Sequence, residues 1–162
     1  MKNIKPVIHS LSTREEKIIC AEMLENSEPW TTLGIDLDQV MSTLNDNFNE
    51  VFVVYIKEEI VGTIIIQTKG AFSGYLKSIA VKPEFRDQHL GKFMMEFVED
   101  FILSKSQNVF LCVSSFNTNA QKFYLKLGYS TIGVLKNYVV EGHDEILMRK
   151  TIGPILKNTG LH

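Results

Sequence analysis

The chain has 162 residues, of which 44% are apolar and 22% are charged, and its formal net charge is −2. This length and composition predict a single globular domain over residues 1–162, and no apolar run is long enough to span a bilayer. The weak negative charge gives no reason to expect a nucleic acid or a membrane as partner. The first 30 residues lack the continuous apolar segment of a secretory signal, so we expect a cytoplasmic protein. The two cysteines, Cys20 and Cys112, lie far apart in sequence and indicate neither a metal cluster nor a disulfide framework.

The first fifty residues predict a short strand and two helices. The strand is expected near Val7. The run 12–15 matches a capping box, which predicts a helix over about residues 13–26. A second helix is expected from Asp36, because the apolar residues that follow it recur at helical spacing. The segment between the two helices, residues 28–34, is expected to be a loop, and it holds the only tryptophan of the chain.

The remainder of the chain alternates apolar strands with helices. Runs of β-branched residues predict buried strands, and Gly62 inside one of them is expected to mark a bulge. The order of elements predicts a mixed α/β fold, with a mostly antiparallel central sheet of about six or seven strands and helices on both faces. The expected strands are 51–56, 60–66, 75–81, 109–113, 129–140 and 144–151, and the expected helices are 91–105 and 119–127.

Two segments about 30 residues apart predict the chemistry. The first is an apolar strand, residues 79–81, followed by a loop that opens a helix at Gly91. Such a loop points backbone N–H groups and a helix dipole at an anion, typically a phosphate. The second is a helix that follows Asn117, carries Tyr124 on a mostly apolar face and ends at Gly128. Together they indicate a phosphate-bearing cofactor and a proton-donating phenol in one site.

In this order the two segments resemble the GNAT superfamily of acyl-CoA-dependent N-acetyltransferases, over about residues 50 to 149. The similarity lies in the strand 79–81, the Arg-x-x-x-x-Gly loop, the long helix, and the pattern Asn-x-x-Ala-x-x-x-Tyr-x-x-x-Gly-Tyr that begins at Asn117. The resemblance implies a sheet splayed at an acetyl-CoA site, no metal, and direct attack of a primary amine on the thioester in a ternary complex. The acceptor would be a small amine, a polyamine, an aminoglycoside-like molecule, or a protein N-terminus or lysine.

The resemblance also implies roles for individual residues. The backbone of Ile79, Ala80 and Val81 would hold the pantetheine arm of acetyl-CoA. Asn117 would bind the same arm, and Tyr124 would protonate the departing thiolate. A phenol with a pKa of about 10 can share a proton with a thiolate whose pKa is about 8.5. The loop that would wrap the pyrophosphate consists of Asp87, Gln88, His89, Leu90, Gly91 and Lys92. Arg86 and Lys92 would add positive charge at the edges of this loop.

Two positions depart from the family pattern. His89 stands where the loop usually has its first glycine, and a histidine is tolerated there unless the backbone needs a positive φ. Cys112 stands five residues before Asn117, where relatives of the ribosomal-protein N-terminal acetyltransferase type carry a glutamate that acts as the base. A cysteine in an apolar strand is expected to pack rather than react. The base that deprotonates the amine is therefore unassigned.

Several assignments have alternatives. The candidate bases are Glu28, Glu141, His143, Glu145 and a chain of water molecules. Tyr124 could instead be a core aromatic, and Asn117 could cap the helix after it. We expect Glu28, Trp30 and Tyr138 to contact the acceptor. The function expected is N-acetyl transfer, and the alternative is a non-catalytic acyl-CoA-binding or sensor module of the same fold. A homodimer is expected only by analogy with the family.

Overall fold

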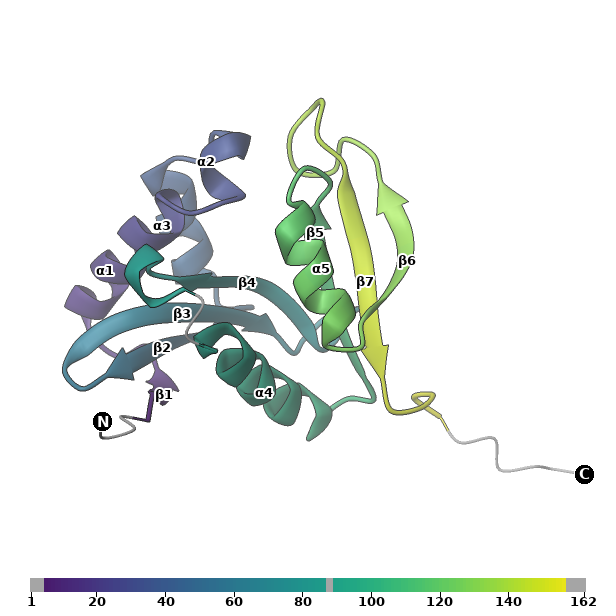
Figure 1. Cartoon of the computed structure of the whole chain (residues 1–162), viewed down its shortest axis with the longest axis horizontal. Coiled ribbons are helices and arrows are strands. Elements are labelled where there is room, and N and C mark those ends of the chain that lie inside the picture. The colour runs from purple at the N-terminus through teal and green to yellow at the C-terminus, as the bar shows by residue number, and fades with distance from the viewer. Residues whose placement is uncertain (1–4, 87–88, 157–162) are drawn as a thin grey trace, which may run out of the picture.

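The computed structural model describes residues 5–86 and 89–156. Its centre is a seven-stranded sheet in the order β1-β2-β3-β4-β5-β7-β6 (Figure 1). Neighbouring strands are antiparallel except for β4 and β5, which are parallel. The predicted mixed, mostly antiparallel sheet is therefore confirmed. The strands are β1 (Val7–Ser10), β2 (Glu50–Ile56), β3 (Glu59–Gln67), β4 (Tyr75–Val81), β5 (Asn108–Ser114), β6 (Ser130–Leu135) and β7 (Glu145–Thr151).

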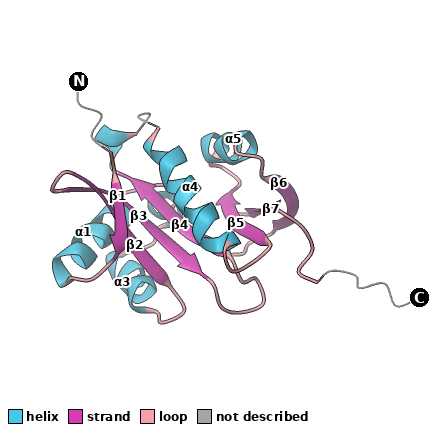
Figure 2. Ribbon diagram, turned by 90° about the horizontal axis from the view of Figure 1, so that it is seen from below, coloured by secondary structure: helices cyan, strands magenta, loops and turns pink. Residues whose placement is uncertain are grey.

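Helices cover both faces of the sheet, as predicted (Figure 2). Side chains of β3 alternate between two cores, because successive residues of a strand point to opposite faces. Ile64 and Ile66 pack in the core beneath α4 and α5, whereas Ile65 packs in the core beneath α1 and α3. The helices are α1 (Arg14–Glu25), α2 (Trp30–Leu33), α3 (Leu37–Asn45), α4 (Leu90–Leu103) and α5 (Thr118–Lys126), and a 3₁₀ turn, η1, spans Pro83–Phe85.

Gly62 lies in a tight contact between the sheet and α4. A Cβ atom on Gly62 would lie 3.0 Å from the Ala80 carbonyl oxygen and 3.0 Å from the Met94 Cε. The β2–β3 register also shifts beside this residue, since Val54 pairs with Gly62 but the next residue of β2 pairs with Ile60. The bulge expected at Gly62 is therefore confirmed, and it lies where α4 approaches the sheet.

Three sequence predictions need correction. The capping box of α1 is formed one residue later than expected, by Thr13 and Glu16. The segment 28–34 is not only a loop, since Trp30–Leu33 form the single-turn helix α2, which ends at Gly34 with a positive φ of 68°. Strand β6 ends at Leu135 instead of continuing to residue 140, and the segment after it is a turn-rich connection to β7.

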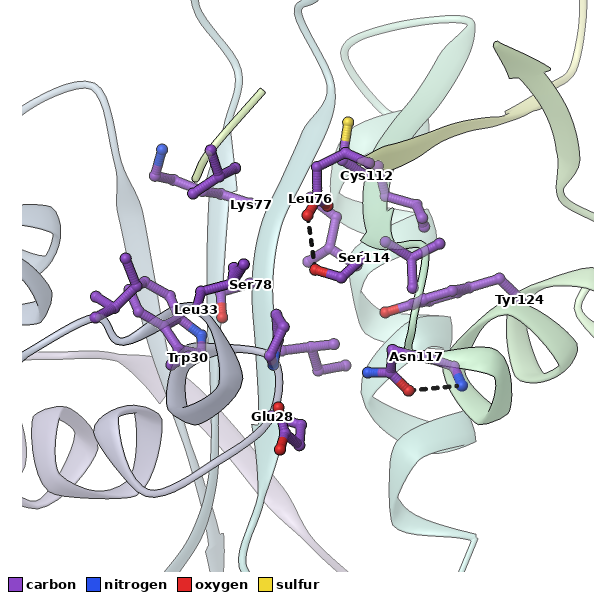
Figure 3. Close-up of a pocket in the computed structure, with 18 of the residues that line it drawn as sticks. Glu28, Trp30, Leu33, Leu76, Lys77, Ser78, Cys112, Ser114, Asn117 and Tyr124 are labelled. Atoms are coloured by element: carbon purple, nitrogen blue, oxygen red, sulfur yellow. Dashed lines mark hydrogen bonds between the residues drawn. The ribbon is translucent and has the colours of Figure 1, made fainter. Parts of the chain in front are cut away.

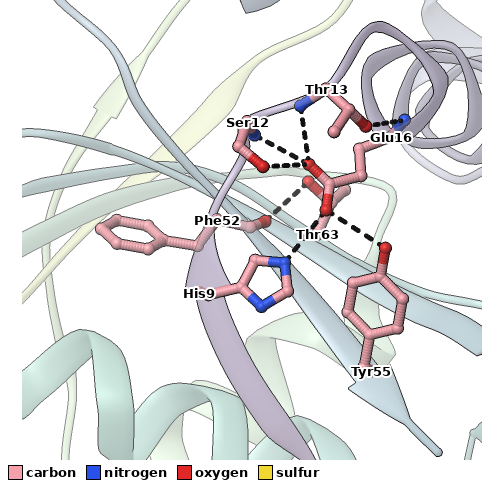
Figure 4. Close-up of polar contacts among 7 residues, drawn as sticks. All are labelled: His9, Ser12, Thr13, Glu16, Phe52, Tyr55 and Thr63. Carbon is pink, nitrogen blue, oxygen red and sulfur yellow. Dashed lines mark hydrogen bonds and ion pairs between the residues drawn. The ribbon is translucent and has the colours of Figure 1, made fainter. Parts of the chain in front are cut away.

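Polar contacts of the Glu16 side chain connect the start of α1 to strands β1 and β2 at the edge of the sheet (Figure 4). Its carboxylate accepts hydrogen bonds from the Ser12 and Thr13 backbone N–H groups, at 2.7 and 3.0 Å, and from the Tyr55 hydroxyl at 3.1 Å. The His9 Nε2 lies 3.0 Å from the same carboxylate. Burial raises the pKa of Glu16, but these hydrogen bonds outweigh it and lower the pKa to about 2.

Because the pKa of Glu16 is lowered from 4.5 to about 2 on folding, the folded state gains stability from the ionised carboxylate. This contribution is complete above pH 4.5 and is lost as the pH falls towards 2. We expect Glu16→Gln to lower the free energy of unfolding at pH 7 by roughly 1–3 kcal/mol. Urea unfolding at several pH values should show this difference shrinking in acid, while the exposed neighbour variant Glu15→Gln changes little. A difference that is constant from pH 7 to pH 3 would contradict the assignment.

Candidate functional site

The site begins where the sheet divides. Strands β4 and β5 pair at only two positions, Tyr75 with Phe110 and Leu76 with Leu111. Beyond these positions the two halves of the sheet run in different directions (Figure 1). A cleft of about 670 Å³ opens along the diverging strands, and residues from both faces of the sheet line it. The edge of β4 that faces β5 is therefore left with backbone groups that can pair with an extended ligand.

One wall of the cleft comes from the start of α4 and from α5. Gly91, Asn117 and Tyr124 line this wall, as do Ile79 and Val81 of β4. The Asn117 Oδ1 accepts a hydrogen bond from the Ala120 backbone N–H at 3.2 Å, so Asn117 caps α5. Because the cap uses the side-chain oxygen, the amide nitrogen of Asn117 is left as a donor at the cleft.

Tyr124 is 7% exposed, and Figure 3 shows its phenol oxygen directed into the cleft. Its ring packs against Phe123 and Tyr129, with ring centroids 5.3 and 5.7 Å away. Burial raises the pKa of Tyr124, which keeps the phenol protonated at neutral pH. The core role and the site role proposed for Tyr124 are therefore compatible, because the ring is packed while the hydroxyl reaches the cleft.

The loop before α4 is described only in part. Asp87 and Gln88 lie outside the described residues. Arg86 lines the cleft, and its Nε donates to the Val81 carbonyl oxygen at 3.1 Å. His89 occupies the N-cap position of α4 with a φ of 60°, so the backbone does need the positive φ that a glycine adopts most easily.

Three other residues predicted for cofactor binding do not line the cleft with their side chains. Leu90 is buried in the core beneath α4, and Ala80 is buried in the core beneath α1. Lys92 is exposed, and its Nζ lies 4.0 Å from the Oε1 of Glu96, one turn further along α4. Any contact of Leu90 or Ala80 with a ligand would therefore use the backbone.

The opposite wall comes from α2 and α3, and Figure 3 shows Glu28, Trp30 and Lys77 across the cleft from Asn117 and Tyr124. Tyr138, in the connection before β7, also lines the cleft, so all three residues predicted to contact the acceptor border it. Tyr138 is 61% exposed and lies at the mouth of the cleft. Glu28 is also exposed, and a hydrogen bond from the Thr32 hydroxyl, at 2.8 Å, lowers the pKa of its carboxyl. Glu28 is therefore a weak base.

A buried polar pair connects β5 to β7 at the cleft. Ser114 is 1% exposed, and its hydroxyl donates to the Glu145 Oε1 at 2.6 Å (Figure 3). Burial raises the pKa of Glu145, while the bond from Ser114 and the charge of His143 lower it in part. Both members of the pair line the cleft.

Cys112 and Tyr75 lie close to this pair and also line the cleft. Burial raises the pKa of the Cys112 thiol, although a hydrogen bond with Tyr75 opposes the shift. Burial raises the pKa of Tyr75 as well. Both groups therefore stay neutral at neutral pH, and Cys112 is not poised as a nucleophile.

Sequence reasoning did not assign a role to Ser114 or Tyr75. The available signal was alternation along β5, because Cys112 and Ser114 are two residues apart and so share one face of the strand. Two of the candidate bases, Glu141 and His143, do not line the cleft. Glu141 is exposed, and His143 packs against Phe116 with ring centroids 5.3 Å apart.

Within residues 5–86 and 89–156 there is no group of three or more His, Cys, Asp or Glu side chains that could hold a metal ion. Over the same ranges, none of the helices combines the length and the apolar composition needed to cross a membrane.

Comparison with known proteins gives consistent results. Residues 15–129 match the family model for the acetyltransferase (GNAT) family. Over 134 residues the chain is 29% identical to the N-terminal acetyltransferase B complex catalytic subunit of Arabidopsis thaliana, and the match covers 74% of this chain and 77% of that protein.

Solved structures share the fold. The ribosomal-protein-S18-alanine N-acetyltransferase from Escherichia coli matches with a TM-score of 0.73 and 20% identity, over 96% of this chain and 99% of that one. A GNAT family acetyltransferase from Elizabethkingia anophelis, solved with acetyl-CoA bound, matches with a TM-score of 0.74 and 18% identity, over 93% of this chain and 100% of that one. At these identities the matches establish the architecture.

The positive φ of His89 generates a prediction about stability. A non-glycine residue in this conformation carries a steric cost that glycine does not. We expect His89→Gly to raise the free energy of unfolding by about 0.5–1 kcal/mol. Lys92→Gly, which introduces the same residue inside the first turn of α4, should lower it by about 0.5–1 kcal/mol. Urea unfolding of both variants would measure these two changes in the free energy of unfolding. A His89→Gly protein that is less stable than the parent would contradict the claim that the backbone at His89 is strained.

Proposed function

Since the chain belongs to the acetyltransferase (GNAT) family, we propose that it transfers the acetyl group of acetyl-CoA to a primary amine. The observation that supports this most strongly is the position of Tyr124, whose hydroxyl faces the cleft at the division between β4 and β5. A proton donor at that place suits the departure of a thiolate from a thioester held between the strands.

The walls of the cleft suit the two substrates differently. On the α4 and α5 side, the pantetheine arm would pair with the free edge of β4, as an added strand does. The pyrophosphate would lie at the first turn of α4, where backbone N–H groups point outwards and the helix dipole favours an anion. Gly91 lies at this turn, and a Cβ atom there would be in ordinary van der Waals contact with the Phe123 ring, 3.4 Å away. On the other side, Trp30 and Tyr138 would contact the acceptor.

The proposed reaction is direct. The amine nitrogen attacks the thioester carbonyl carbon, a C–N bond forms, and the C–S bond breaks with its electron pair going to sulfur. A backbone N–H near Ile79 would stabilise the carbonyl oxygen as negative charge develops on it.

Tyr124 would act on the sulfur mainly by donating a hydrogen bond. Burial raises the pKa of Tyr124, so complete transfer of its proton to a thiolate becomes less favourable. Burial in the same cleft would also raise the pKa of the departing thiol. The pKa values of the thiol and of the Tyr124 phenol would therefore stay closer together. Tyr124 would therefore share its proton as the sulfur leaves and recover it as the product amide forms.

Tyr124→Phe tests this role. We expect the turnover of acetyl-CoA to fall roughly 100-fold, since the donor to the sulfur is removed. The dissociation constant of acetyl-CoA should change less than about twofold, because ground-state binding depends mainly on the backbone and the phosphate groups. Thiol release measures the first quantity and calorimetry the second.

Tyr129→Phe is the matched control for this experiment. Tyr129 packs against Tyr124, and the substitution removes the same hydroxyl group, but Tyr129 does not line the cleft. The control should keep near-parental turnover. Equal losses in the two variants would indicate a packing effect, and unchanged turnover in Tyr124→Phe would remove Tyr124 from the chemistry. Acetyl-CoA binding without turnover in the parent protein would favour the non-catalytic module.

A further inference from the structure

We propose that Glu145 is the general base that takes a proton from the acceptor amine. This inference rests on the proposed function and adds the catalytic group that the sequence left unassigned. Glu145 is the first residue of β7, lies opposite Ser114 of β5, and lines the cleft while only 5% exposed.

The carboxylate of Glu145 is held in place. The Ser114 hydroxyl donates to its Oε1 at 2.6 Å, and Ser114 is itself fully buried. A donor on one oxygen restrains the carboxylate and leaves the other oxygen to accept a proton. A base must be oriented in this way before it can act in a single geometry.

Glu145 also borders the same cleft as the residues expected to contact the acceptor. The segment before it in the chain carries Tyr138 and Val139, which line this cleft as well. Tyr124, the proposed donor to sulfur, reaches the same cleft from α5. A base from β7 and an acid from α5 therefore border one space, so an amine next to Glu145 would meet a thioester next to Tyr124.

The charges around Glu145 favour this role. Tyr75 and Cys112 interact with it electrostatically, and burial raises the pKa of both, so both are neutral near pH 7. Tyr138 interacts in turn with Tyr75, and the Lys77 side chain lines the same cleft. Burial raises the pKa of Glu145 and so strengthens it as a base, whereas the positive charge of His143 acts in the opposite direction.

The other candidate bases are less suitable. Glu28 lines the cleft, but it is exposed and a hydrogen bond from Thr32 lowers the pKa of its carboxyl. Glu141 and His143 do not line the cleft. Burial raises the pKa of the Cys112 thiol, so it does not provide a thiolate at neutral pH.

The proton balance is complete. The acceptor enters as an ammonium ion and gives one proton to Glu145, which later releases it to solvent. The neutral amine then attacks, the C–N bond forms and the C–S bond breaks. The second N–H proton leaves the nitrogen as the amide forms and replaces the proton that Tyr124 shares with the sulfur, giving an N-acetyl product and a free thiol.

Glu145→Gln tests the proposal, because the amide keeps the shape and the bond with Ser114 but cannot accept the proton. With acetyl-CoA saturating, we expect kcat/KM for a primary amine at pH 7 to fall at least 100-fold, with acetyl-CoA binding by calorimetry within twofold of the parent. The activity of the variant should recover as the pH rises towards the pKa of the amine, since free amine then needs no base.

The pH profile separates a base from a merely structural residue. Activity requires ionised Glu145, so kcat/KM of the parent should fall as the pH drops through the pKa of this group. Ser114→Ala removes a hydrogen bond that lowers this pKa, so the acidic limb should move to higher pH. Glu141→Gln, an exposed acid on the adjacent connection, should leave both the rate and the profile unchanged.

The outcomes distinguish two failures. If the parent protein turns over no acetyl-CoA with any amine, the proposed function fails. If the parent is active and Glu145→Gln keeps its rate and acidic limb, Glu145 is not the base. A loss of activity together with a loss of acetyl-CoA binding or of the folded far-UV spectrum would reflect structure. In that case an unmoved acidic limb in Ser114→Ala overturns the proposal, and a shifted one upholds it.

Discussion

The structure depends on one interrupted pairing, the two-residue parallel contact between β4 and β5. On its other edge, β4 pairs with β3 along its length, and β5 pairs with β7 along its length in the same way. β4 and β5 can therefore diverge from each other while each keeps its hydrogen bonds to the strand on its other edge. Backbone groups that a continuous sheet would pair internally are left facing a cleft. The proposed binding of a pantetheine arm is a direct use of this unpaired edge.

The same separation places polar groups in surroundings that change their acidity. Tyr124, Tyr75 and Glu145 line the cleft, and burial raises the pKa of each. For a phenol this shift preserves a proton donor, and for a carboxylate it strengthens a base. Glu16 shows the opposite case outside the cleft, since its several hydrogen bonds outweigh burial and lower its pKa to about 2. Burial acts in the same direction on both carboxyl groups, and the number of hydrogen-bond donors decides the net direction of each pKa shift.

Much of the architecture could be predicted because its signals are local. Runs of β-branched apolar residues identified the strands, and the bulge at Gly62 followed from a glycine inside an apolar run. The capping signal before α1 was real, but Thr13 and Glu16 form the box, which shows that adjacent serine and threonine residues are hard to rank from sequence. The helix at Trp30 was missed, because a single turn leaves no periodic pattern.

The candidate site likewise has residues that the sequence predicts and residues that depend on contacts between distant parts of the chain. Asn117, Tyr124 and Gly91 were found because they belong to a motif with fixed spacing, and the structure brings them to one cleft. The bond between Ser114 and Glu145 joins residues 31 apart, and it depends on the β5–β7 register, which the sequence does not state. His89 has a positive φ, which the path of the loop imposes and which a histidine in the sequence does not indicate.

The most direct test of the central claim is thiol release from acetyl-CoA by the parent protein, with an acceptor panel of small amines, polyamines, aminoglycosides and peptides with free N-termini. We expect saturable turnover with one acceptor class and a product heavier by one acetyl group in mass spectrometry. Protection of the protein by acetyl-CoA against heat, with no thiol released for any acceptor class, would contradict acetyl transfer and favour a module that only binds the thioester.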